Sequence, residues 1–172
     1  MRFRGTCYRA HDPKWAFSPL SGEGARTHGG RFNPKGVPAL YLALTLDGMF
    51  REMAHGFAHR FDPLTVCSYD VDVDDVVDLR TAAARKTNGV SIAQLQCPWF
   101  EDLAKKQKPP SWSVAERLIA RGAAGILVPS FARGATPATS NLVLWKWGPT
   151  LPHRVEVYDP SGRLPKDQAS WS

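Results

Sequence analysis

The sequence has 172 residues, of which 43% are hydrophobic and 22% charged, with a net charge of +6 and a pI near 9.5. This composition is ordinary for one globular domain and excludes a disordered chain. The positive charge is compatible with a phosphate-bearing ligand, a nucleic acid or an acidic partner, although the Lys and Arg residues are scattered apart from Lys105, Lys106 and Lys108.

The cysteines and the N-terminus indicate a cellular compartment. Cys7, Cys67 and Cys97 are widely spaced and form no CxxC pair. This pattern is typical of a reducing cytosol and unlike a disulfide framework or a zinc site. The first fifteen residues are polar and basic, unlike a signal peptide, and no apolar run is long enough to span a membrane. The sequence therefore predicts a cytoplasmic protein without a membrane segment.

The first third of the chain predicts two strands, a long loop and one helix. Residues 2–9 alternate loosely and predict a strand, whereas residues 11–34 are rich in Gly, Pro, Ser and Asn and predict a loop. Residues 37–43 predict a buried strand. Thr45 can cap a helix over residues 46–59. Its apolar residues recur at helical spacing and should face the core: Leu46, Met49, Phe50, Met53 and Phe57.

The middle of the chain predicts a strand and two short helices. Residues 64–79 read as a strand, and residues 91–95 and 99–106 as helices. The second half of the strand is rich in carboxylates, namely Asp70, Asp72, Asp74, Asp75 and Asp78. A divalent cation site is one interpretation, but strand periodicity divides these side chains between two faces and the EF-hand pattern is missing. The sequence therefore favours an exposed, solvated edge.

The last third predicts one more helix and three strands. Ser113 and Glu116 have the spacing of a capping box, which would open a helix running to about Arg121. Strands follow at 125–129, 141–147 and 155–158. Because strands and helices are mixed without a regular βαβ alternation, the sequence predicts a single-domain α+β fold.

Gly29, Gly30 and Arg31 form a turn that could bind an anion. Glycines let backbone N–H groups approach an anion, and a guanidinium can hold a phosphate through two parallel hydrogen bonds. The turn lacks the Rossmann and P-loop patterns, and a purely structural glycine turn is the alternative.

Glu52 lies toward the edge of the expected helical stripe. A carboxylate there could stabilise an oxocarbenium ion or act as a general base. The alternative is an exposed ion-pair partner of Arg51 or Arg60. His55 and His59 have metal-ligand spacing, but no HExxH motif is present and we expect no metal.

Ser130 ends a buried strand. It lacks the G-x-S-x-G elbow of a hydrolase nucleophile, but its hydroxyl could still donate a hydrogen bond into a cleft.

Together these residues resemble the RES-domain family, the toxin half of RES–Xre toxin–antitoxin pairs. The matching stretches are Tyr8–Arg9, Gly29–Pro34, Ala39–Ala43, Glu52, Val128–Ser130 and Asn141–Trp145. The family is named for an arginine, a glutamate and a serine, which map to Arg31, Glu52 and Ser130. The resemblance implies that these three residues and Tyr41 are catalytic. It also implies substrate-binding roles for Arg9, Gly30, Asn33 and Asn141.

The resemblance implies a fold like that of ADP-ribosyltransferase toxins, with a catalytic domain over residues 1–150 and residues 151–172 as a partly irregular extension. It implies an enzyme that destroys NAD+ by cleaving the nicotinamide–ribose bond, through hydrolysis or phosphorolysis. NAD+ would be the substrate, and no cofactor is expected. The expected partner is an Xre-type antitoxin that covers or enters the active site. A homodimer core is also implied, and no direct DNA binding.

Two alternatives remain at this stage. ADP-ribose could be transferred to a macromolecule instead of to water or phosphate. A basic nucleic-acid-binding module or a ribonuclease toxin is the other alternative, although no RRM, KH, helix-turn-helix or zinc-finger signature is present.

Overall fold

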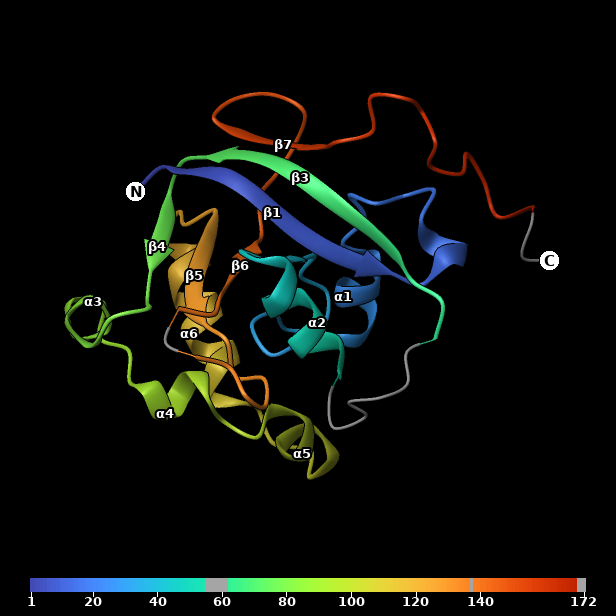
Figure 1. Ribbon diagram of the computed structural model, residues 1–172. Helices are drawn as coiled ribbons and strands as arrows, with labels where there is room; N and C mark the ends of the chain where they lie inside the picture. Colours follow the sequence, from blue (N-terminus) through green and yellow to red (C-terminus); the bar gives the residue numbers. More distant parts are fainter. Residues whose placement is uncertain (55–61, 137, 170–172) are drawn as a thin grey trace.

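The computed structural model describes residues 1–54, 62–136 and 138–169. Its centre is a sheet in the order β4-β5-β6-β2-β1-β3-β7, antiparallel throughout except for the parallel β4–β5 pair (Figure 1). The strands are β1 Phe3–His11, β2 Leu40–Ala43, β3 Thr65–Val73, β4 Val76–Asp78, β5 Gly125–Pro129, β6 Ser140–Leu144 and β7 His153–Val157. β7 adds to the edge of the sheet beside β3, so the C-terminal segment shares the core of the domain.

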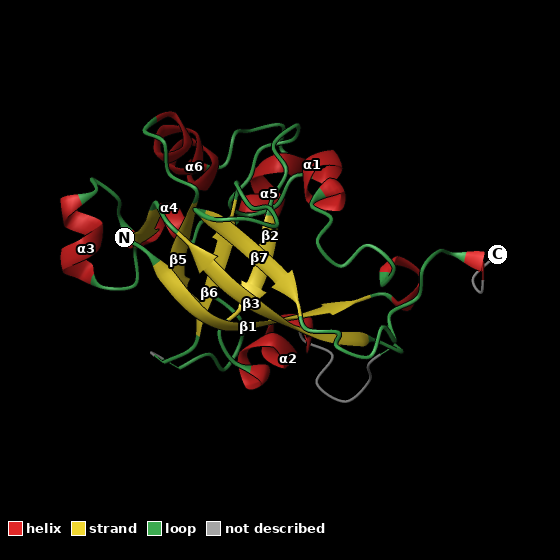
Figure 2. Ribbon diagram, turned by 90° about the horizontal axis from the view of Figure 1, so that it is seen from above, coloured by secondary structure: helices red, strands yellow, loops and turns green. Residues whose placement is uncertain are grey.

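The helices are short and lie around this sheet. They are the 3-10 helix η1 Pro13–Trp15, α1 Glu23–His28, α2 Leu46–Ala54, α3 Ala82–Thr87, α4 Ile92–Leu95, α5 Trp99–Ala104 and α6 Pro110–Ala120. In the view of Figure 2, α1 and α6 lie above the strands and α2 lies below β1. This single-domain α+β architecture confirms the predicted fold class. Among the described helices, none has both the length and the apolar character that a membrane crossing requires.

Two hydrophobic cores lie on the two faces of the central strands. In β5, Leu127 points into a core shared with β1, β3 and β7, whereas Ile126 and Val128 point into a core shared with α4 and α6. Val143 of β6 belongs to the second core, and its neighbours along the strand belong to the first. Because β5 and β6 are covered on both faces, they read as continuous apolar runs, and this explains why the sequence predicted both strands.

The predicted strand over residues 64–79 is wrong as a single element. The chain turns between β3 and β4, where Asp75 has a φ of 60° in the left-handed region. Asp72 also differs from the expected solvated edge, because it is 4% exposed. Its carboxylate accepts hydrogen bonds from Arg2 Nε at 2.6 Å and Nη2 at 2.8 Å, and Arg2 directly precedes the neighbouring strand β1.

Three helical predictions need correction. The predicted loop over residues 11–34 contains η1 and α1, and α3 was missed. The predicted capping box is wrong, because α6 already begins at Pro110 and Ser113 is its fourth residue. A capping box does exist at the start of α4, where Ser91 and Gln94 exchange hydrogen bonds.

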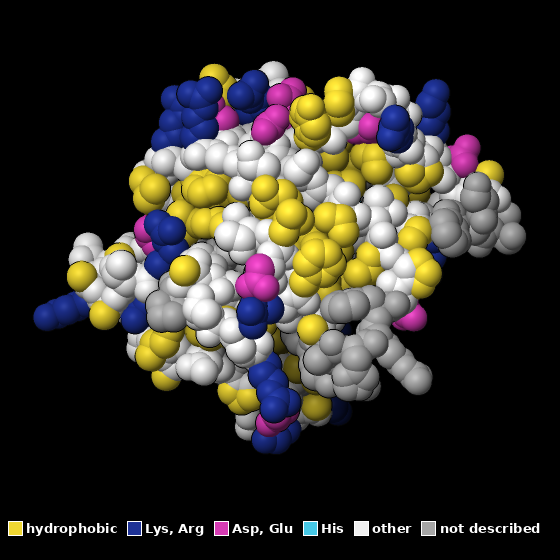
Figure 3. Space-filling view, in the orientation of Figure 1, with side chains coloured by type: hydrophobic (Ala, Val, Ile, Leu, Met, Phe, Trp, Pro, Cys, Tyr) yellow, Lys and Arg dark blue, Asp and Glu magenta, His cyan; other side chains and the backbone are white. Residues whose placement is uncertain are grey.

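The apolar stripe of α2 does not face the core as predicted. Met49 is 3% exposed, whereas Leu46, Phe50 and Met53 are between 41% and 46% exposed. Helical periodicity shows that a stripe exists, but the neighbouring elements decide which part of it is covered. Hydrophobic side chains accordingly gather on the surface around α2 (Figure 3). Residues 55–59 of the predicted helix lie outside the described part of the chain.

Candidate active site

Glu52 is the meeting point of three elements that are distant in the sequence. It lies on α2, whose first turn is fixed by Thr45 Oγ1 accepting a hydrogen bond from Gly48 N at 3.0 Å. Glu52 Oε1 accepts a hydrogen bond from Ser130 Oγ at 2.5 Å and another from Asn141 Nδ2 at 2.6 Å. Ser130 directly follows β5, and Asn141 is the second residue of β6. The ends of two buried strands therefore hold one carboxylate oxygen of α2.

These two hydrogen bonds fix the orientation of the Glu52 carboxylate. Hydrogen bonds to an ionised oxygen are short and strong, and both donors here belong to rigid strand ends. Ser130 is itself buried, and its Oγ accepts a hydrogen bond from Ala132 N at 3.2 Å. Among the described residues, none donates to Glu52 Oε2, so this second oxygen is the one that can contact a ligand.

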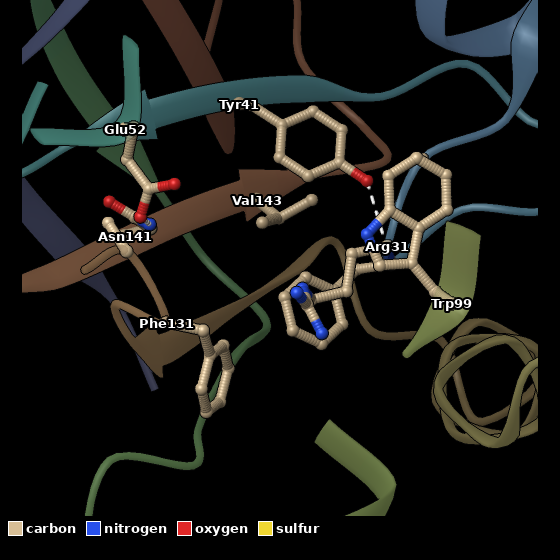
Figure 4. Close-up of a pocket in the computed structure, with 10 residues that line it drawn as sticks. Arg31, Tyr41, Glu52, Trp99, Phe131, Asn141 and Val143 are labelled. Atoms are coloured by element: carbon tan, nitrogen blue, oxygen red, sulfur yellow. Dashed lines mark hydrogen bonds between the residues drawn. The ribbon is translucent and has the colours of Figure 1, made fainter. Parts of the chain in front are cut away.

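Glu52 faces a cavity of about 240 Å³, called here the Glu52 cavity. It is lined by Gly30, Arg31, Phe32, Tyr41, Glu52, Trp99, Phe131, Ala132, Asn141 and Val143. Figure 4 shows Glu52 and Asn141 at one end of this cavity and Arg31 and Trp99 at the other, with Tyr41 and Val143 between them. The cavity thus combines one carboxylate and one guanidinium with aromatic walls.

Tyr41 contributes its ring to the cavity and its hydroxyl to the protein. The hydroxyl donates to Asn33 Oδ1 at 2.7 Å and accepts a hydrogen bond from Phe32 N at 3.0 Å. Burial raises the pKa of the Tyr41 phenol, so it stays protonated at neutral pH. The hydroxyl is therefore a structural anchor, and the ring is the part of Tyr41 that a ligand can contact.

Asn33 and Gly30, for which the resemblance implied substrate-binding roles, both contact the Tyr41 hydroxyl and support it. Asn33 is 0% exposed, and its Nδ2 donates to the carbonyls of Ala25 at 2.8 Å and Val37 at 2.9 Å. The N–H of Gly30 donates to Asn33 O at 3.0 Å, so it is already used within the turn and does not approach an anion. A Cβ on Gly30 would lie 2.6 Å from the Tyr41 hydroxyl, which explains the glycine at this position.

The turn that carries Arg31 is held through its carbonyl groups. Three consecutive carbonyls, those of residues 30–32, each accept a side-chain hydrogen bond: from Trp112 Nε1 at 2.7 Å, from Ser111 Oγ at 2.5 Å and from Trp145 Nε1 at 2.9 Å. Two of these donors belong to α6, and the third follows β6. These three hydrogen bonds fix the backbone of the turn, and Arg31 and Phe32 of the turn line the Glu52 cavity.

Arg31 is a half-buried cation held by carbonyl groups. Its Nη1 donates to Leu95 O at 3.3 Å and to Cys97 O at 2.7 Å, and its guanidinium lies 5.2 Å from the centre of the Phe131 ring. Burial lowers the pKa of Arg31, but a guanidinium remains charged at neutral pH. No carboxylate in the described ranges forms an ion pair with it. The remaining guanidinium donors suit an anionic or carbonyl-bearing ligand.

A second cavity, called here the Arg9 cavity, lies beside the first and has a volume of about 200 Å³. Three of its lining residues also line the Glu52 cavity, namely Tyr41, Glu52 and Asn141. Arg9 borders it, and its Nη1 donates to the carbonyls of Pro19 at 3.3 Å and Ser21 at 3.2 Å. Burial lowers the pKa of Arg9, which nevertheless keeps its charge. Glu52 therefore lies between two cavities, each with its own arginine.

The sequence missed two aromatic residues of the site. Trp99 is the first residue of α5, and Phe131 lies in the loop after β5. Both line the Glu52 cavity. The sequence does not distinguish Trp99 from the other five tryptophans or Phe131 from the other seven phenylalanines, because aromatic residues are most often core residues.

The described residues contain no cluster of three or more His, Cys, Asp or Glu side chains that could hold a metal ion. The partners of Glu52 are a hydroxyl and an amide, which donate hydrogen bonds to it. His55 and His59, whose spacing resembles that of metal ligands, lie outside the described part of the chain.

Comparison with known proteins shows a family and similar solved structures. The family model of the RES domain matches residues 6–167. The crystal structure of the MbcT–MbcA toxin–antitoxin complex of M. tuberculosis contains a chain that is 27% identical, with a TM-score of 0.60. The alignment covers 92% of this chain and 84% of that one. A search of curated proteins found no match.

Proposed function

This chain belongs to the RES-domain family, and from that premise we propose that it is a toxin that cleaves the nicotinamide–ribose bond of NAD+. The observation that carries the proposal is the geometry of Glu52. One carboxylate oxygen is held by Ser130 and Asn141, and the carboxylate lines a cavity with aromatic walls. A fixed carboxylate beside a flat aromatic pocket suits a substrate that develops positive charge next to an aromatic ring.

The reaction needs stabilisation of charge more than it needs proton transfer. When the bond between ribose C1′ and the pyridinium nitrogen breaks, its electron pair goes to the nitrogen, and nicotinamide leaves as a neutral molecule. The ribose becomes an oxocarbenium-like cation, and Glu52 stabilises it electrostatically. An oxygen of water or phosphate then forms the new bond to C1′, and an attacking water molecule gives up one proton to the solvent. No general acid is required, in agreement with a site that has one carboxylate at its centre.

The neighbouring residues fall into two groups of roles. Ser130 and Asn141 are positioning residues, because each donates to Glu52. The rings of Tyr41, Trp99 and Phe131 provide the surface on which nicotinamide packs. Arg31, whose guanidinium can hold a phosphate, is one candidate for binding the NAD+ diphosphate, and Arg9, in the adjoining cavity, is an equally cationic one.

We also propose an antitoxin partner. The related solved structure is a toxin–antitoxin complex, and a site open enough to admit NAD+ is open enough to be blocked by a partner protein. The resemblance predicts an Xre-type antitoxin and a homodimer core. The experiments on this chain therefore require protein purified free of any antitoxin.

The products formed from NAD+ labelled in its adenine ring test the reaction and identify the acceptor. Hydrolysis gives labelled ADP-ribose, and phosphorolysis gives a labelled ADP-ribose phosphate only when phosphate is present. Label on a protein or nucleic acid would instead show an ADP-ribosyltransferase. Intact NAD+ in the presence of folded, antitoxin-free protein would contradict the proposal. Salt-sensitive RNA binding by the same sample would then favour the nucleic-acid alternative.

A further inference from the structure

A third cavity adjoins the Arg9 cavity. It has a volume of about 560 Å³ and lies where the end of β1 meets η1 and α1; we call it the loop cavity. Its lining residues are Arg9, Ala10, His11, Asp12, Trp15, Phe17, Ser18, Ser21, Glu23, Gly24, Thr27 and His28. It shares Arg9 and Ala10 with the Arg9 cavity, which in turn shares Glu52 with the Glu52 cavity. The Glu52 and Arg9 cavities therefore adjoin at Glu52, and the Arg9 and loop cavities adjoin at the end of β1, around Arg9 and Ala10.

We propose that the loop cavity binds the adenosine half of a dinucleotide whose reacting half lies at Glu52. This inference rests on the proposed function. The order of the cavities matches the order of groups in the substrate. Nicotinamide lies in the Glu52 cavity, its ribose at Glu52, the diphosphate at Arg9 and the adenosine in the loop cavity.

The loop cavity offers aromatic surface to a purine. Trp15 and Phe17 lie with their ring centres 6.3 Å apart and their planes tilted by 34°. Trp15 is 53% exposed, which is unusual for a tryptophan, and it lines the cavity. Bases stack on exposed aromatic rings of this kind, and the contact accepts any base because every base has a flat π surface.

His28 can distinguish the edge of an adenine. Its Nδ1 lies 3.0 Å from Gly24 O, and because a carbonyl only accepts, Nδ1 must carry the hydrogen. In the neutral ring Nε2 is then an acceptor, which suits the 6-amino group of adenine. Hydroxyl groups for the ribose are supplied by Ser18, Ser21 and Thr27.

Arg9 is well placed to hold the diphosphate between these two halves. It borders both the Arg9 cavity and the loop cavity, and only its Nη1 is used by the carbonyls of Pro19 and Ser21. In the described ranges no carboxylate pairs with it, so its charge is left for an anion. This order leaves Arg31 beside the nicotinamide end and moves the diphosphate from Arg31 to Arg9.

The loop that forms the cavity is attached firmly to the sheet. Tyr69 of β3 donates its hydroxyl hydrogen to Pro19 O at 2.9 Å. The same hydroxyl lies 2.6 Å from His11 Nε2, which must therefore be the donor in that contact. A loop fixed in this way can present a preformed pocket, which reduces the entropy lost on binding.

The Trp15→Ala variant tests the adenosine pocket when NAD+ is compared with nicotinamide mononucleotide, which keeps the scissile bond but lacks the AMP part. We expect the KM for NAD+ to rise roughly tenfold, the loss typical of one stacked base, with kcat unchanged. The KM for the mononucleotide should stay the same. Tyr158→Ala, which truncates an exposed aromatic residue in the segment after β7, is the matched control.

Direct binding of AMP, measured by calorimetry, makes the result independent of turnover. The wild-type protein should bind AMP, and Trp15→Ala should weaken this binding by a similar factor. Equal changes in KM for both substrates, or AMP binding that Trp15→Ala leaves unaltered, would overturn the adenosine pocket. If the wild-type protein turns over neither substrate, the proposed function fails, and AMP binding alone still decides the pocket.

Discussion

The Glu52 cavity and the loop cavity, which we call the Glu52 end and the loop end of the proposed binding site, are built in different ways. At the Glu52 end, buried side chains from two strand ends converge on one carboxylate oxygen, with hydrogen bonds of 2.5 and 2.6 Å. At the other end, the loop cavity lies between η1 and α1, and its largest aromatic residue, Trp15, is half exposed. Chemistry needs atoms held within fractions of an ångström, whereas recognition tolerates an adaptable surface. The comparison suggests that the Glu52 end sets kcat and the loop end sets substrate preference.

Removal of both donors to Glu52 should have the largest effect among the supporting residues. The free energy of one hydrogen bond to a charged group corresponds to roughly a tenfold change in rate. Ser130→Ala combined with Asn141→Ala should therefore lower kcat roughly 100-fold. The KM for NAD+ should change less than kcat, because neither residue lines the loop cavity. Steady-state kinetics of nicotinamide release measure both constants.

Ser140→Ala is the control for this double variant. Ser140 precedes Asn141 on β6, so its side chain points to the opposite face of the sheet. A double variant with the kcat of the wild-type protein would show that Glu52 does not depend on these donors.

Low pH should decrease the stability of the folded protein through a histidine at the loop end. His11 is buried beneath it, and burial together with the charge of Arg9 lowers the pKa of His11 to about 4 from the ordinary 6.5. As the pH falls below 6.5, His11 becomes protonated in the unfolded chain but stays neutral in the folded protein, so the free energy of unfolding decreases. This contribution amounts to about 2 kcal/mol between pH 6.5 and pH 5.

Urea unfolding at pH 7, 6 and 5 measures this loss. His11→Gln removes the titrating ring and keeps a donor for Tyr69, so its free energy of unfolding should fall less steeply with pH. The same pH dependence in both proteins would contradict a buried neutral His11.

Gly30→Ala should have a smaller effect, confined to the Glu52 end. The new Cβ would lie 2.6 Å from the Tyr41 hydroxyl and 2.7 Å from Asn33 Oδ1. Because the turn can shift slightly, the destabilisation should lie at the lower end of the roughly 1–3 kcal/mol typical of overpacking. Thermal unfolding measures it, with Gly148→Ala as control, since a Cβ there meets nothing within 4 Å. Equal stability of the two variants would show that Tyr41 is not held tightly.

The sequence predicted the elements whose environment is uniform. β5 is apolar because both of its faces are buried, and its bounds were predicted correctly. α1 was missed because it is short, contains Gly24 and follows Gly22 without a capping side chain. α6 was started too late, because Pro109 and Pro110 look like a loop although proline suits the first turn of a helix.

The candidate site was harder to predict from the sequence than the fold. The resemblance named Glu52, Ser130 and Asn141, but only the structure shows that the last two hold the first. Their separations of 78 and 89 residues leave no periodic signal. The sequence did not predict the loop cavity either, because most of its lining residues come from the stretch over residues 11–34 that was predicted to be a loop.

The release of nicotinamide from NAD+ by the purified, antitoxin-free protein is the most direct test of the role of Glu52. The wild-type protein should release nicotinamide, and Glu52→Gln should lower the rate by roughly 10²–10³ without a change in melting temperature. The amide keeps one acceptor oxygen for Ser130 and Asn141, so the orientation of the side chain is retained, while the negative charge is lost and the second oxygen is replaced by an NH2 group. Release by Glu52→Gln at the wild-type rate would contradict the account.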